Sequence, residues 1–108
     1  MFQARQGDIY FRSVEKIPNK GIKKKNDRIL AYGEVTGHSH QIVSPALSEL
    51  EMVTDENGDI FVRSSGEEIK VGHDEHNIVT LPANKWICVS RQREYDPLAE
   101  NRQRRVLD

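Results

Sequence analysis

The sequence predicts a single all-β domain, either a small antiparallel β-barrel or a β-sandwich. Short runs rich in β-branched and aromatic residues recur along the chain, separated by turn residues about every ten positions. The chain has 108 residues, a length that suits one compact core, so residues 1–108 are assigned to one domain. No long amphipathic helix is evident. A short helix or ordered tail is predicted only at residues 96–108, where Asp96 and Pro97 form a typical helix start.

The first half of the chain begins with a predicted strand and a loop. GDIYFRSV, residues 7–14, is the first strand, and residues 16–28 are predicted to be a mobile basic loop because they contain proline, glycine and three consecutive lysines. The segments RILAYGEV, HQIV and LSELEMV follow as strands. The residues of the last segment expected to face inward are Leu47, Leu50 and Met52.

The second half contains clearer turn signals. TDENGD, residues 54–59, predicts a hairpin turn, and IFVRS returns from it. IKV and NIVTL flank the second histidine patch, and Asn84 in LPANKW is suited to a left-handed turn position. WICVSRQREY is predicted to be a central strand because apolar residues lie on both of its faces. Cys88 in that strand is expected to be a small buried hydrophobe.

Composition argues against a membrane or nucleic-acid partner. Sixteen basic residues nearly balance seventeen acidic ones, and the basic stretches IKKK and RQRR lie in separate segments without an aromatic motif for stacking bases. No apolar run approaches the length of a bilayer, and the N-terminus lacks the pattern of a signal peptide. With one cysteine there is neither an internal disulfide nor a thiolate cage. We therefore expect a cytoplasmic protein whose metal ligands would be His, Asp or Glu.

The four histidines lie in two short patches and predict a divalent-metal site. His38 and His40 face the same side of an extended strand, with Cα atoms about 6.6 Å apart, and both rings can reach an ion about 2.0–2.1 Å from each ring nitrogen. His73 and His76 are three residues apart, so both can join the first pair only if HDEH forms a turn. Imidazoles combined with oxygen ligands suit Zn²⁺, Fe²⁺, Mn²⁺ or Ni²⁺.

The leading hypothesis is a metal-binding protein in which His38, His40 and His76 ligate one ion, with His73 as the fourth candidate. If the protein is an enzyme, the ion would activate a bound water or orient a small substrate, in hydrolysis or another metal-dependent reaction. Because ligation needs neutral imidazoles, bound metal should be released as the pH falls through about 6.5. A carboxylate would move the proton, and the candidates are Glu34, Glu75 and Glu94. The alternative is a non-catalytic binding or structural module, phage-associated or homo-oligomeric, whose histidines lie on exposed loops and never meet.

Two further segments carry charged residues of interest. In RQREYDP, alternation places Arg91, Arg93 and Tyr95 on one face, where they would bind the phosphate or carboxylate of a small molecule. The competing interpretation is a strand end whose charges pair in solvent. QGD, residues 6–8, contains a Gly-Asp pair typical of turns, so Asp8 is predicted to be a turn residue and not a catalytic acid.

The blocks QGDIYF, LAYGEVTGHSHQI, HDEHNIVTLPANKW, QREYDP and RRVLD resemble a family of small bacterial and phage proteins. They cover nearly the whole chain, but the resemblance implies no activity because that family is uncharacterised. A looser resemblance is to the cupins, small β-barrels in which an H-x-H pair, a following carboxylate and a later histidine hold a metal. His38 and His40 match the pair, whereas Ser44 stands where the glutamate is expected and no histidine follows LPANKW. This resemblance implies a related barrel with a different order of ligands.

Overall fold

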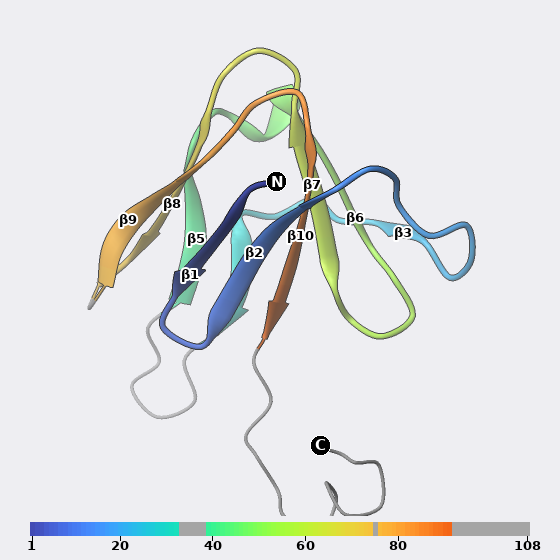
Figure 1. Cartoon of the computed structure of the whole chain (residues 1–108), viewed down its shortest axis with the longest axis horizontal. Helices are drawn as coiled ribbons and strands as arrows, with labels where there is room; N and C mark the ends of the chain where they lie inside the picture. Colours follow the sequence, from blue (N-terminus) through green and yellow to red (C-terminus); the bar gives the residue numbers. More distant parts are fainter. Residues whose placement is uncertain (33–38, 75, 92–108) are drawn as a thin grey trace, which may run out of the picture.

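The computed structural model describes residues 1–32, 39–74 and 76–91, whose strands form two antiparallel sheets (Figure 1). The six-stranded sheet has the order β1 (Gln3–Gln6), β2 (Ile9–Val14), β10 (Trp86–Arg91), β7 (Ile60–Ser64), β6 (Leu50–Thr54) and β3 (Lys23–Lys24). The four-stranded sheet has the order β4 (Ile29–Tyr32), β5 (Ser39–Ser44), β8 (Ile69–His73) and β9 (His76–Leu81). A single 3-10 turn, Leu47–Glu49, is the only helical element among the described residues.

The two sheets pack face to face as a β-sandwich and are not closed into a barrel, so the all-β prediction is confirmed in its sandwich form. Alternate residues of each strand point into the shared core, as the two-residue period of a strand requires. A fully buried aliphatic or aromatic side chain of this kind contributes about 1.5–3 kcal/mol, so the shared core holds the sheets together. The core residues include Phe11, Ile87 and Val62 from the larger sheet and Ile42, Val71 and Leu81 from the smaller one.

The prediction of a central strand at WICVSR is confirmed. β10 lies between β2 and β7, and Figure 1 shows this last described strand beside the first strands of the chain. Cys88 is buried and free. Burial raises the pKa of its thiol by disfavouring the thiolate, so Cys88 is a small buried hydrophobe, as expected, and not an activated nucleophile.

Several local predictions also agree with the structure. TDENGD forms the β6–β7 hairpin turn, in which Gly58 has a φ of 86°. Asn84 has a φ of 62°, the left-handed conformation expected of it. Of the three residues predicted to face inward from LSELEMV, Met52 is part of the buried core, and Leu47 and Leu50 pack against it.

Two features differ from the predictions. A first strand, β1, precedes Gly7, so Gly7 and Asp8 form the turn of a β1–β2 hairpin instead of opening a strand. Within the predicted basic loop, residues 16–28, Lys23 and Lys24 form strand β3, because their backbone pairs with the edge of β6. Their exposed lysine side chains suit an edge strand. The helix predicted at residues 96–108 lies outside the described residues. Among the residues that the structure describes, no helix is long and apolar enough to span a bilayer.

Candidate metal centre

Three of the four histidines come together between the sheets. The ring centroids of His40 and His73 are 4.2 Å apart, and those of His73 and His76 are 4.7 Å apart. His40 and His76 are separated by 6.2 Å with nearly parallel rings. Two segments more than thirty residues apart in the chain therefore bring their imidazoles to one place, and we call these three residues the histidine cluster.

Strand pairing explains why these histidines meet. β5 pairs with β8 so that Gln41 lies opposite Gly72, and the same antiparallel register sets His40 opposite His73. His73 in turn pairs directly with His76 across the β8–β9 hairpin, where a register shift follows Val71. The direct pairing of His73 with His76 brings both imidazoles to one side, which the prediction required of this pair. The cluster is a row across three neighbouring strands.

Gln6 fixes the protonation pattern of His40. The Gln6 amide nitrogen donates hydrogen bonds to the backbone oxygens of Val71, at 2.9 Å, and Asn77, at 2.8 Å. Its Oε1 must therefore accept the hydrogen bond that joins it to His40 Nδ1, at 2.8 Å. His40 consequently carries its proton on Nδ1, and in the neutral ring Nε2 presents a lone pair. Both Gln6 and His40 are only 2% exposed, so this network is shielded from water.

The environment of His40 favours that neutral form. Burial lowers its pKa to about 4, and the positive charges that His73, His76 and Arg91 can carry act in the same direction. The carboxylate of Asp8 acts to raise the pKa of His40, but its effect is smaller than the combined effect of burial and these charges. At neutral pH His40 therefore has an unprotonated Nε2, the state that a metal ligand or a general base requires.

Asp8 faces the cluster from the other sheet. Its Oδ1 is 3.7 Å from His40 Nε2, and its Oδ2 is 3.3 Å from Nε of Arg91, at the end of β10. Because neutral His40 offers a lone pair at Nε2, two acceptors face each other at this point. Such a pair is stabilised when a cation or a hydrogen-bond donor lies between them. About 3.4 Å would separate two ligand atoms of one tetrahedral ion with bonds of about 2.0–2.1 Å, close to the spacing observed.

The turn that carries Asp8 also contacts His76. Gly7 has a φ of 61°, and a Cβ built on it would lie 2.8 Å from Nε2 of His76. A side chain at this position would be strained and would push against the imidazole, so glycine allows the ring to rest on the turn. The whole QGD segment, residues 6–8, therefore contacts the histidine cluster.

The side chains are near one another but are not arranged around a common point. Among the described residues, no group of three or more His, Cys, Asp or Glu side chains has a geometry that would hold an ion. Imidazoles bound to one tetrahedral ion have ring centroids about 5 Å apart, so the observed distances call for rotations and not for a change of backbone. His76 is exposed and His73 is half-buried, so both rings have room to turn.

The structure answers only part of the sequence-based site prediction. It brings together His40, His73 and His76, and it places His73, ranked fourth from the sequence, between the other two. Arg91 lies beside the cluster through Asp8. The other predicted residues lie outside the described part of the chain: His38, Glu34, Glu75, Arg93, Glu94 and Tyr95.

Sequence reasoning missed two residues of the site. Asp8 is a turn residue, as predicted, but its carboxylate also points at His40 and Arg91. Gln6 was not singled out, because glutamine is usually exposed and its burial here depends on contacts with the opposite sheet. The available signal was the turn itself, since a Gly-Asp turn at the end of a hairpin places its flanking side chains at one edge of the sandwich.

Comparison with known proteins identifies the family. A family model described as Domain of unknown function (DUF8820) matches residues 5–92, which is most of the chain. The chain belongs to this family. The domain includes Asp8, the histidine cluster and Arg91, so the candidate site lies inside it, and the expectation of an uncharacterised family is confirmed. No curated protein matched the chain, and no solved structure matched it.

Proposed function

We propose that this member of the DUF8820 family binds one divalent cation at the histidine cluster, with His40, His73, His76 and Asp8 as ligands. The observation that carries the proposal is the pair of acceptors facing each other, His40 Nε2 and Asp8 Oδ1, at 3.7 Å. A cation between them would replace an unfavourable contact with two favourable ones. His38, two residues before His40 in the sequence, remains a candidate ligand from the sequence alone.

The contact between Gln6 and His40 supports this proposal. Metal-binding histidines usually donate the N–H of the other ring nitrogen to an oxygen atom, which fixes the tautomer and the ring orientation. Gln6 Oε1 does this for His40 Nδ1. A ligand set of imidazoles and a carboxylate suits Zn²⁺, Fe²⁺, Mn²⁺ and Ni²⁺. His40, the second histidine of the H-x-H sequence, lies beside His73 and His76 of a later hairpin, which is consistent with the same set of metals.

The proposal extends to catalysis by a metal-dependent enzyme, with hydrolysis as the first reaction class to assay. An ion held by three imidazoles with an open position lowers the pKa of a bound water to about 7 in zinc enzymes. Opening that position would require Asp8 to leave the ion, and its carboxylate would then accept a proton from the water. Arg91 would orient an anionic group beside it.

The direct test is metal analysis of untagged protein, followed by titration of the chelator-treated protein with Zn²⁺, Fe²⁺, Mn²⁺ and Ni²⁺. The informative variant is His40→Asn, because the asparagine amide takes the place of Nδ1 and can still donate to Gln6, while the Nε2 ligand is lost. We expect one bound ion per chain in the wild type and at least about a 100-fold loss of affinity in the variant. Loss of a residue that only orients a ligand already costs about 10–100-fold.

Asp8→Asn and Asp27→Asn form a matched pair for the carboxylate. Both carboxylates lie at the surface beside a basic side chain, Asp8 with Arg91 and Asp27 with Lys25. Only Asp8→Asn should weaken metal binding. Wild-type protein that takes up none of the four metals at neutral pH would overturn the proposal and favour the alternative of a non-catalytic binding module.

A further inference from the structure

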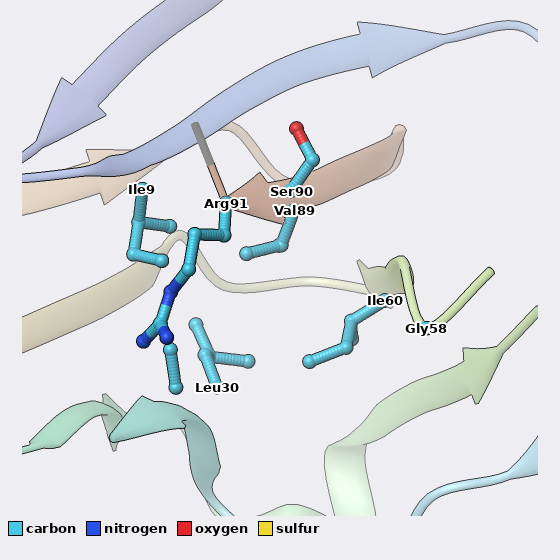
Figure 2. A pocket seen from close by; sticks show the side chains of 8 residues that line it. Ile9, Leu30, Gly58, Ile60, Val89, Ser90 and Arg91 are labelled. Atoms are coloured by element: carbon cyan, nitrogen blue, oxygen red, sulfur yellow. The ribbon is translucent and has the colours of Figure 1, made fainter. Parts of the chain in front are cut away.

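A cavity opens between the two sheets next to the metal centre. The described residues line an open cavity of about 320 Å³, with walls from both sheets. Ile9, Ile60 and Val89 come from the six-stranded sheet, and Leu30 and Ala31 come from β4 of the other. Figure 2 shows Ile9 and Arg91 on one side of the cavity and Ile60 and Gly58 on the other. The walls are therefore mainly aliphatic.

The size of the cavity sets the size of its ligand. An engineered apolar cavity of about 150 Å³ binds benzene, and small-molecule pockets begin at about 300 Å³. A cavity of about 320 Å³ therefore suits a molecule of roughly a dozen non-hydrogen atoms. Its aliphatic walls favour a ligand with an apolar body.

Arg91 supplies a charged group at one end of this apolar space. In Figure 2 its guanidinium extends past Ile9 toward Leu30. The contact with Asp8 is made by Nε, and the planar guanidinium matches the geometry of a carboxylate. Arg91 and Asp8 have opposite charges, so a divalent cation on the histidine cluster would leave this end of the cavity positive.

We infer that the cavity binds a small monocarboxylate, with its apolar tail between the sheets and its carboxylate on Arg91. This inference rests on the proposed function, since it names the substrate class of the same site. Asp8 contacts both Arg91 and His40, so a carboxylate held by Arg91 lies one side chain away from the proposed ion. Binding of the tail depends on the cavity alone and is measurable without metal.

The test is a titration of ¹⁵N-labelled full-length protein with octanoate, followed by amide chemical shifts. Octan-1-ol has a similar tail without the charge, and acetate has the charge without the tail. We expect saturable shifts at Leu30, Val89 and Arg91 with octanoate, binding at least about tenfold weaker with octan-1-ol, and no saturation with acetate. Hexanoate, two methylenes shorter, should bind about tenfold more weakly than octanoate.

Two variants, each with a matched control, locate the carboxylate and the tail. Arg91→Gln should weaken octanoate about tenfold or more without changing octan-1-ol, whereas Arg63→Gln, an equally exposed arginine paired with Glu51, should change neither. Ala31→Leu fills the cavity and should abolish binding of both probes. Ala4→Leu places the same side chain on another half-buried alanine, outside the cavity lining, and should leave binding intact.

The outcomes distinguish this inference from the proposed function. Zinc binding without octanoate binding overturns the carboxylate pocket and leaves the metal centre standing. Octanoate binding to protein that takes up no metal overturns the metal centre and supports the pocket. Equal affinity for octanoate and octan-1-ol, or shifts that persist in Ala31→Leu, would also overturn the inference. Tighter octanoate binding after zinc addition supports both proposals.

Discussion

Two turns of this molecule contain both glycine and aspartate, but they use the carboxylate differently. In the β6–β7 turn, Asp55 Oδ1 accepts hydrogen bonds from the backbone N–H groups of Asn57 and Asp59, both at 2.9 Å. In the β1–β2 turn, the carboxylate of Asp8 points to His40 in the other sheet and to Arg91 on β10 of its own sheet. One aspartate maintains its own turn, and the other faces a different sheet.

This difference shows that a turn signal and a site signal can be the same residue. Within the described part of the chain, the Asp55 carboxylate accepts hydrogen bonds from the backbone of its own loop, which is the usual role of aspartate in turns. The turn at Gly7 is so short that Gln6 and Ile9 pair directly, and the turn contacts the histidine cluster. The surroundings of the carboxylate therefore separate a structural aspartate from a candidate ligand.

The largest effect is expected from Gln6→Leu in the strand that leads into the Asp8 turn. The variant removes the partners of two backbone oxygens and of His40 Nδ1 in a buried place. We expect the free energy of unfolding to fall by about 3–5 kcal/mol and metal affinity to fall by about 10–100-fold. Urea denaturation and zinc titration measure the two effects.

Gln3→Leu is the control for that substitution, because Gln3 is an exposed residue of the same strand. Its unfolding free energy should stay within about 0.5 kcal/mol of the wild type. Similar losses in the two variants would show that Gln6 contributes only as part of an edge strand and not through its contacts with the other sheet.

A smaller effect is expected from pH in the metal-free protein. The pKa of His40 is about 4 when folded and has an ordinary value of 6.5, so between these values the unfolded chain binds a proton that the folded chain does not. Stability therefore falls as the pH drops from about 6.5 to about 4, by up to about 3 kcal/mol. Urea denaturation at pH 7.5 and pH 5, with chelator present, measures this loss.

His40→Asn is the variant that tests the assignment of this pH dependence. It retains a donor toward Gln6 and cannot titrate, so its stability should change less between the two pH values. Asp55→Asn is the control, because Asp55 belongs to a turn distant in sequence. Its unfolding free energy should depend on pH as strongly as that of the wild type. An unchanged slope in His40→Asn would assign the acid sensitivity to other groups.

The smallest effects come from replacing each turn aspartate by alanine. Asp55→Ala should cost about 1–2 kcal/mol of unfolding free energy, because two backbone N–H groups lose their acceptor. Asp8→Ala should cost no more than about 0.5 kcal/mol, because its contact with Arg91 is a partly exposed ion pair. Metal affinity should fall about 10–100-fold in Asp8→Ala and stay constant in Asp55→Ala, and the opposite pattern would contradict our comparison.

Local signals in the sequence predicted much of the fold. Asn84 and the hairpin of residues 54–59 have the conformations that their residue types indicate, and the apolar faces of β10 identified the central strand. β1 was missed because Gln3–Gln6 contains two glutamines and an arginine and resembles an exposed segment. Its place in the fold comes from pairing with β2 and contact with β9, which local pattern does not report.

The candidate site was predictable only in part for a similar reason. The clustering of the histidines in the sequence indicates that they meet, and their spacing indicates which of them can share a face. The register that sets His40 opposite His73 is a tertiary property, as is the hydrogen bond from Gln6 across the sandwich. Residue types suggest which side chains can bind a metal, but the packing of the two sheets decides which of them come together.

Gln6 also joins the two layers of the protein at one edge. Its side chain begins on β1 and ends on backbone oxygens of β8 and β9, while the same amide group holds the imidazole of His40. A cation that immobilises this imidazole would also immobilise the Gln6 amide, and with it the hydrogen bonds that join β1 to β8 and β9. A bound ion would thus hold the two sheets together at this edge, and its loss would allow the edge of the sandwich to open locally.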